Sequence, residues 1–160
     1  MIKKLFICIF LLLNLNAYAS FITEEGYENF LIGKTSLLSV YENYPEIKPG
    51  IADANDSTQV ISFYFIDKGI ELFFMSKQSD APGSIYLFQI DITAPCLAVT
   101  KNNIGVPIGI GSKETVLKKY GTNITGKEQL DKSNLYFYGR LWVSTQKGKV
   151  ERISITDSTY

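Results

Sequence analysis

The chain has 160 residues, with 16 lysines and arginines against 16 aspartates and glutamates, no histidine and two cysteines. This length suits one domain, and the balanced charge gives no electrostatic reason to expect a nucleic acid partner. The lack of histidine excludes Ser-His-Asp and Cys-His nucleophilic systems and removes the commonest metal ligand.

Residues 1–19 have the features of a secretory signal peptide. Two lysines precede an apolar run over residues 5–13, and residues 17–19 (Ala-Tyr-Ala) form a small-x-small cleavage site. The run is about half of the ~20 residues that a membrane-spanning helix needs. We therefore predict cleavage before Ser20, a periplasmic or secreted mature protein, and no stable membrane insertion. Because Ser20 is not a cysteine, no lipid anchor is expected.

Removal of the signal peptide leaves 14 basic and 16 acidic residues, a formal charge of −2, and a single cysteine, Cys96. A lone cysteine has no intramolecular partner, so the sequence predicts no disulfide framework. We expect Cys96 to be a small buried hydrophobe, with a bridge to another chain as the alternative. The hydrophobic core must then supply the stability.

The first half of the mature chain, residues 20–94, begins with a segment over residues 21–31 that suits either a first helical turn or an edge strand. A short helix is predicted next, with Ser36 as its cap, Val40, Tyr41 and Tyr44 as its apolar stripe, and Pro45 as its stop. Runs of β-branched and aromatic residues then predict three strands, and Asp67-Lys68-Gly69 predicts a hairpin turn between the first two. The predicted strands are residues 60–66, 69–75 and 85–92.

The second half, residues 95–160, shows the same order of predicted elements. Residues 96–99 suggest a short strand, and Ser112 begins a predicted helix that ends at Gly121. Gln146-Lys147-Gly148 predicts the later hairpin turn. The predicted strands of this half are residues 134–138, 140–145 and 149–156.

A sequence motif links the two halves. Residues 32–44 and 108–120 both follow I-G-x-x-S-x-x-x-V-φ-x-x-Y, where φ is apolar, and they start seventy-six residues apart. A recurrence of this length indicates a duplicated structural unit. We therefore predict an α+β fold of two tandem repeats, each a helix plus a three-stranded antiparallel meander. The repeats are expected to form one domain with one curved sheet and helices on one face.

This combination resembles a known family of small secreted bacterial modules. A short capped helix carrying V-L-K-K-Y-G, followed by a meander ending in G-K-V-x-x-I-x-I, is similar to the group around the β-lactamase inhibitory protein and the SmpA/OmlA outer-membrane lipoproteins. The resemblance implies two units with aligned sheets and a non-catalytic, protein-binding surface. The chain departs from both types, because it lacks a disulfide pair and an anchoring cysteine. No functional residue of the family can be matched to a position here.

Motifs for chemistry are incomplete. Residues 53–57 begin like a calcium loop, but the sixth and twelfth positions hold Thr58 and Tyr64, where glycine and glutamate are required. The glycine-rich residues 104–111 lack the Gly-Lys-Ser/Thr of a phosphate-binding loop. We predict no metal, no cofactor and no enzymatic activity. Nothing in the sequence brings together the carboxylate pairs that acid-base chemistry would use, Asp67 with Glu71 or Glu128 with Asp131.

The positive signal is aromatic. Residues 60–66 (VISFYFI) and 134–138 (NLYFY) place large rings on both faces of a strand, so one set must point away from the covering helices. One interpretation is a second core layer or a subunit seam. The other is a recognition face, since tyrosine, tryptophan and arginine dominate protein-protein hot spots. The candidate partner-binding residues are Tyr64, Tyr136, Tyr138, Arg140 and Trp142.

The sequence therefore predicts a secreted or periplasmic, non-catalytic module that binds another protein, as an inhibitor or immunity protein does. The partner would be an enzyme, a toxin or an envelope component. An envelope-assembly or adaptor protein at the outer membrane is the alternative. A carrier that holds a small ligand between helix and sheet is a third possibility.

Overall fold

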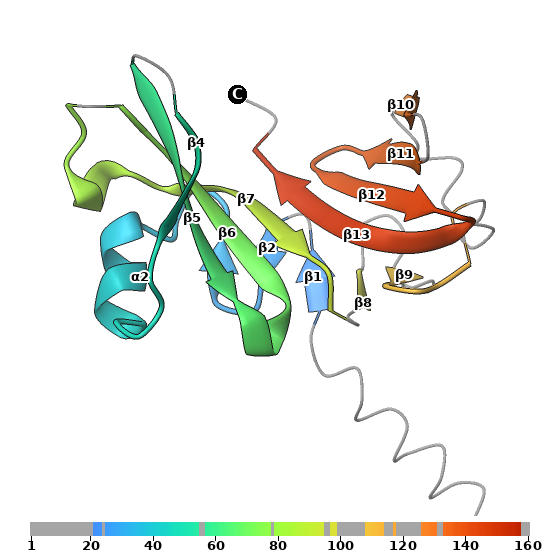
Figure 1. Cartoon of the computed structure of the whole chain (residues 1–160), viewed down its shortest axis with the longest axis horizontal. Helices are drawn as coiled ribbons and strands as arrows, with labels where there is room; N and C mark the ends of the chain where they lie inside the picture. Colours follow the sequence, from blue (N-terminus) through green and yellow to red (C-terminus); the bar gives the residue numbers. More distant parts are fainter. Residues whose placement is uncertain are drawn as a thin grey trace, which may run out of the picture.

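A computed structural model describes residues 21–23, 25–54, 57–77, 79–94, 97–98, 108–113, 117, 126–130 and 133–157 (Figure 1). Several predictions fall outside these residues. They are the signal peptide, Cys96, Asn55 of the calcium-like loop, residues 104–107 of the glycine-rich segment, and the second helix apart from its first residues and Leu117.

The described part is dominated by one antiparallel sheet of eight strands. Its first four strands are β4 (Gly50–Ala54), β5 (Thr58–Phe65), β6 (Ile70–Lys77) and β7 (Leu87–Ile92). The other four are β10 (Gly126–Leu130), β11 (Ser133–Tyr138), β12 (Leu141–Gln146) and β13 (Lys149–Thr156). The order is β10-β11-β12-β13-β7-β6-β5-β4, so two meanders join where β13 pairs antiparallel with β7. This join runs from Ile153 opposite Ile92 to Thr156 opposite Gln89.

A second, smaller sheet and one helix accompany the large sheet. The small sheet has the order β3-β2-β1-β8-β9 and includes a parallel pairing of β1 with β8. Its strands are β1 (Phe21–Thr23), β2 (Gly26–Tyr27), β3 (Phe30–Leu31), β8 (Leu97–Ala98) and β9 (Ile108–Gly109). The helix is α2 (Leu37–Asn43), and single 3-10 turns lie at η2 (Ile66–Lys68) and η3 (Pro82–Ser84). Residues 21–31, for which the sequence suited either a helical turn or an edge strand, therefore contain three short strands.

The short helix forms for the reasons expected from its sequence. The Ser36 side chain accepts a hydrogen bond from the backbone N–H of Ser39 (3.1 Å), which satisfies one of the free donors of the first turn. Leu37 and Val40 are buried, and the helix ends before Tyr44 and Pro45. Such a short helix is not stable alone, so this packing holds it.

The rings of the first half show which side of the large sheet the helix and the small sheet cover. The ring of Tyr41 on α2 meets that of Phe63 on β5 edge-on, with ring centroids 5.1 Å apart. Phe30 of β3 contacts Phe65 of β5 at 5.3 Å. α2 and β3 therefore pack on the same face of β5, and this face contains the core.

The predicted hairpins are confirmed. Phe65 pairs with Ile70 across the first turn, where Gly69 has a left-handed φ of 58°. In the later turn, Lys147 and Gly148 have φ values of 50° and 72°, and both left-handed residues are needed for a two-residue type I′ turn. Glycine supplies this conformation without a steric cost.

Each of the two I-G-x-x-S stretches is hydrogen-bonded to the last strand of its meander, through different positions of the motif. The Gly33 N–H donates to the Leu87 carbonyl at 2.8 Å, and the Leu87 N–H donates to the Thr35 carbonyl. In the second half, the Gly111 N–H donates to the Val150 carbonyl at 2.7 Å, and the Val150 N–H donates to Ser112. Each stretch is thus attached near the start of the last strand of its meander.

The predicted fold class is nevertheless wrong. The described chain is mostly β, each meander has four strands instead of three, and α2 is the one α-helix within the described residues. The extra strands, β4 and β10, come from segments for which no strand was predicted. Edge strands of this kind need no alternating apolar pattern, and all of β4 is exposed. A sheet of very short strands covers part of the core face, where Phe30 of β3 contacts Phe65 of β5.

Candidate functional site

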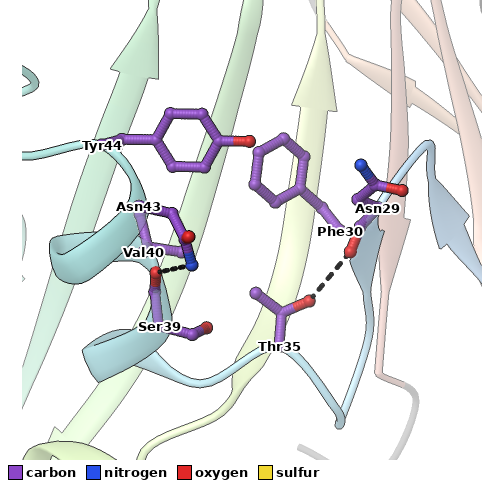
Figure 2. A pocket seen from close by; sticks show the side chains of 7 residues that line it. All are labelled: Asn29, Phe30, Thr35, Ser39, Val40, Asn43 and Tyr44. Carbon is purple, nitrogen blue, oxygen red and sulfur yellow. Dashed lines mark hydrogen bonds between the residues drawn. The ribbon is translucent and has the colours of Figure 1, made fainter.

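A hollow of about 370 Å³ lies between α2 and the turn after β2 (Figure 2). Several of its polar side chains are already bonded within the chain. The Thr35 hydroxyl accepts from the Leu31 N–H (2.8 Å), the Ser39 hydroxyl donates to the Ser36 carbonyl (2.7 Å), and the Asn43 amide donates to the Ser39 carbonyl (2.8 Å). The first bond ties the chain just before α2 to β3, and the other two lie within α2 and its cap. The hollow therefore gives no specific support to a small-ligand role.

The more informative surface is the side of the eight-stranded sheet opposite α2 and the small sheet, which we call the open face. Strand alternation separates it from the core. Phe63 and Phe65 are 0% and 5% exposed, whereas Tyr64 between them is 49% exposed. The larger apolar side chains of the open face are at least partly accessible; they are Val60, Tyr64, Phe73, Met75, Leu135, Phe137 and Trp142.

The strand registers align one row of side chains across six strands of the open face. Each residue is directly opposite the next, in the order Tyr64, Glu71, Asp91, Ser154, Trp142 and Phe137. Residues directly opposite each other point to the same face, so the row is continuous. At ~4.8 Å per strand, its five steps span about 24 Å. We call this set the cross-sheet row.

The ends of the cross-sheet row are aromatic. Phe137 on β11 and Trp142 on β12 meet edge-to-face, with their ring centroids 5.1 Å apart. This is a favourable arrangement for aromatic pairs, so each ring holds the other in place. Tyr64 on β5 ends the row on the first meander.

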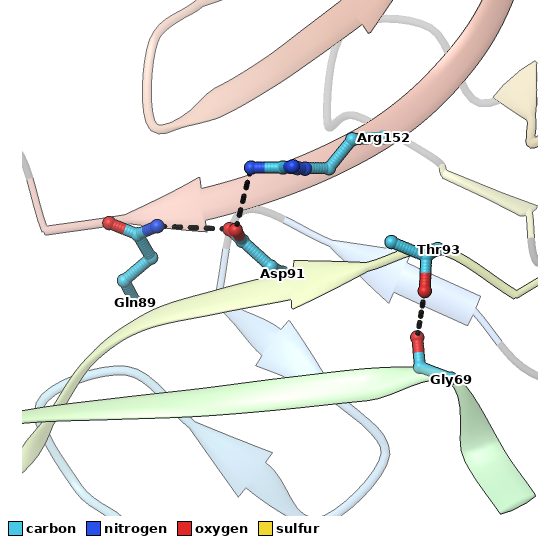
Figure 3. A network of polar contacts seen from close by, with 5 residues as sticks. All are labelled: Gly69, Gln89, Asp91, Thr93 and Arg152. Atoms are coloured by element: carbon cyan, nitrogen blue, oxygen red, sulfur yellow. Dashed lines mark hydrogen bonds and ion pairs between the residues drawn. The ribbon is translucent and has the colours of Figure 1, made fainter. Parts of the chain in front are cut away.

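The centre of the row is charged (Figure 3). The Gln89 amide donates to Asp91 Oδ1 at 2.9 Å, and Arg152 Nη1 donates to Asp91 Oδ2 at 3.4 Å. The Asp91 side chain is only 9% exposed, whereas that of Arg152 is 55% exposed. Because Asp91 belongs to β7 and Arg152 to β13, this ion pair crosses the join between the meanders.

A second hollow opens beside this ion pair. It has a volume of about 270 Å³ and is lined by Tyr64, Glu71, Phe73, Asp91, Thr93 and Arg152. The Thr93 hydroxyl donates to the Gly69 carbonyl at 3.3 Å, so the end of β7 is tied to the turn before β6 (Figure 3). The hollow combines two acidic side chains, one basic side chain and two aromatic rings.

The structure brings together only part of the predicted partner-binding set. Tyr64 and Trp142 lie on the open face, 49% exposed and half-buried respectively. Tyr136 and Tyr138 point to the core face, and the Tyr138 hydroxyl donates to the Leu117 carbonyl at 3.4 Å. Their neighbour Phe137 takes the outward position instead.

Arg140 lies in the turn between β11 and β12 and not on the open face. Its guanidinium pairs with the Asp157 carboxylate at 3.0 Å, and its Nε donates to the Thr156 carbonyl at 3.4 Å. Arg140 therefore ties this turn to the end of β13.

The predicted site residues did not include Glu71, Asp91, Phe73 or Arg152. Glu71 was considered only with Asp67, four positions away, whereas its partner across the sheet is Asp91. The sequence did show a charged residue within each of two predicted strands, Glu71 in residues 69–75 and Asp91 in residues 85–92. Only the pairing of these strands shows that the two carboxylates lie opposite each other.

No three His, Cys, Asp or Glu side chains are grouped to hold a metal ion in the described part of the chain. Among the same residues, no helix is long and apolar enough to cross a membrane. Comparisons with protein-family models, curated proteins and solved structures found no match. The resemblance to the β-lactamase inhibitory protein and SmpA/OmlA group therefore stays a prediction.

Proposed function

We propose that the protein is a secreted or periplasmic, non-catalytic module, inhibitor- or immunity-like, that binds another protein through the open face. The observation that carries this proposal is the cross-sheet row. It has partly exposed aromatic rings at both ends, on strands from both meanders. Accessible tyrosine and tryptophan side chains are the residue types that most often dominate protein-protein binding energy.

The size of the open face suits a protein partner. Seven steps between eight strands, at ~4.8 Å each, give a width of about 34 Å, and five residues per strand give a length of about 17 Å. The resulting flat area of about 570 Å² approaches the 600–1,000 Å² that one partner contributes to a typical specific complex. A side-chain surface is rougher than a plane, so its accessible area is larger.

The experiment compares variants of the open face with a matched variant on the other side. Immobilised wild-type protein is exposed to an envelope extract of its own cells, and the retained protein is identified and its affinity measured. Trp142→Ala and Tyr64→Ala are expected to weaken binding by roughly 5- to 30-fold. Leu38→Ala is the control, because Leu38 is a large apolar residue 42% exposed on α2.

Circular dichroism must first show that all three variants remain folded. Binding that is unchanged in both open-face variants, or that is lost equally in the Leu38 variant, would refute the proposal. The identity of the partner separates the inhibitor- or immunity-like role from the alternative. An outer-membrane component would favour an assembly or adaptor protein.

A further inference from the structure

The hollow beside Asp91 has a size and a charge that indicate what enters it. Its volume of about 270 Å³ lies below the ~300–1,000 Å³ of sites that enclose a whole small molecule. One side chain of a partner protein is a better match to this volume. The hollow lies on the cross-sheet row, at the centre of the face proposed above for partner binding.

The charges of the hollow are unbalanced. Glu71 and Asp91 carry two negative charges directly opposite each other on neighbouring strands, and Arg152 provides one positive charge. Like charges directly opposite in a sheet are destabilising, so this placement has a local cost. The formal charge of the lining is −1, which favours a cationic group.

Arg152 does not remove this imbalance. Among the described residues it forms one ion pair, with Asp91 at 3.4 Å, and its side chain is 55% exposed. Both Asp91 oxygens already accept a hydrogen bond, one from Gln89 and one from Arg152. Within the described residues, the Glu71 carboxylate makes no hydrogen bond or ion pair. Glu71 is therefore the acceptor that an entering group would meet.

The walls of the hollow suit a guanidinium. Tyr64 and Phe73 are both neighbours of Glu71 on the open face: Tyr64 lies opposite it across the strands, and Phe73 lies two residues along β6. Guanidinium groups stack on aromatic rings and bind a carboxylate through two parallel hydrogen bonds. An ammonium group is a point charge and uses such walls less well.

From this geometry we infer that the hollow receives an arginine side chain of the partner protein, with Glu71 accepting from its guanidinium and the rings of Tyr64 and Phe73 forming the aromatic walls around it. This inference rests on the proposed function, since it assigns an anchor to the same face. It also predicts that the contact surface of the partner is basic at its centre and apolar on either side.

The test uses the purified protein and short blocked peptides as probes. Backbone amide shifts are followed by NMR while Gly-Arg-Gly is added, and the neutral isostere Gly-citrulline-Gly, Gly-Lys-Gly and Gly-Glu-Gly are the comparisons. We expect Gly-Arg-Gly to give saturable shifts at Tyr64, Glu71 and Asp91, with an affinity on the order of millimolar. The citrulline and glutamate peptides should give none at the same concentration, and the lysine peptide should bind more weakly.

Three variants then locate the interaction. Glu71→Gln should weaken Gly-Arg-Gly binding by at least about 5-fold, and Arg152→Gln should strengthen it by removing a like charge. Glu128→Gln removes the same charge from the far end of the sheet, where Glu128 on β10 is exposed, and should change binding by less than about 2-fold. Thermal unfolding of each variant shows whether a lost shift reflects lost structure.

Stronger binding of Gly-Glu-Gly than of Gly-Arg-Gly, or loss of binding in Arg152→Gln, would overturn the inference and point to an acidic anchor. Equal shifts with the citrulline peptide, or no saturable shift, would also overturn it. Neither result bears on the proposed function, which fails if partner binding is unchanged in Trp142→Ala and Tyr64→Ala or is lost equally in Leu38→Ala. The two failures are therefore distinguishable.

Discussion

Replacing Gly69 by alanine is expected to destabilise the protein through two effects that can be separated. Gly69 has a φ of 58°, and an added Cβ would overlap the Ala94 side chain and lie 2.8 Å from the Ala94 nitrogen. A left-handed alanine costs about 1–2 kcal/mol, and forced overpacking adds about 1–3 kcal/mol. Loss of unfolded-chain entropy offsets about 0.4–1 kcal/mol. We expect a net loss of roughly 2–4 kcal/mol and a melting temperature lower by roughly 6–15 °C.

Urea denaturation measures this loss, and Gly148→Ala is the matched control. Gly148 has a φ of 72° but no heavy atom within 4 Å of an added Cβ, so its variant carries only the backbone cost, about 1 kcal/mol. Ala94→Gly should partly rescue Gly69→Ala, with a coupling of about 1 kcal/mol. Equal losses for both glycine variants, or no rescue, would show that Ala94 is not the obstacle.

Three further predictions concern other parts of the fold. Ser36→Ala removes the cap of α2 and should lower the free energy of unfolding by about 1 kcal/mol in urea denaturation, and an unchanged midpoint would contradict the cap. Phe63→Ala should lower the free energy of unfolding by about 3–5 kcal/mol in urea denaturation, because the Phe63 ring is fully buried. Tyr64→Ala should lower it by less than about 1 kcal/mol, and similar losses for the two variants would contradict the faces assigned to these residues. The hydrogen bond to Glu28 raises the pKa of Lys68 above its usual value of 10.5. The pair therefore stabilises the fold fully below pH 10.5, and this stabilisation is lost as the pH rises through the pKa of Lys68 in the folded protein. Both side chains are partly exposed, so the advantage over Lys68→Gln should stay below ~1 kcal/mol at pH 8 and should shrink as the pH rises above 10.5; an advantage that does not shrink would exclude the ion pair.

The strands with strong local patterns could be predicted from the sequence. β5, β6, β11, β12 and β13 lie within two residues of their predicted bounds, since β-branched and aromatic residues and turn glycines all favour the same structure. Edge strands β4 and β10 could not be predicted in this way. Each has one neighbour in the sheet, and all of β4 is exposed, so neither strand needs the alternating apolar pattern that marks a half-buried strand.

The candidate site could be predicted only in part, because it depends on which strands pair. The sequence showed that rings occupy both faces of residues 134–138, but not which set faces outward. The register of β11 with β12 decides this point by placing Phe137 opposite Trp142. A shift by one residue would have exchanged Phe137 with the two tyrosines. The position of Asp91 beside Arg152 depends on the pairing of β7 with β13, which no local signal indicated.

The join between β7 and β13 connects the stability of the fold to the proposed binding. It contains four residue pairs, and it fixes how Tyr64 on one meander lies relative to Trp142 on the other. A partner that contacts both ends of the cross-sheet row binds only when the join is formed. By mass action, such a partner stabilises the joined state by an amount that grows with its concentration over its dissociation constant. An arginine placed against Glu71 would also offset the repulsion from Asp91 that the free protein tolerates. The local cost at the centre of the open face is therefore reduced in the complex that the proposal requires.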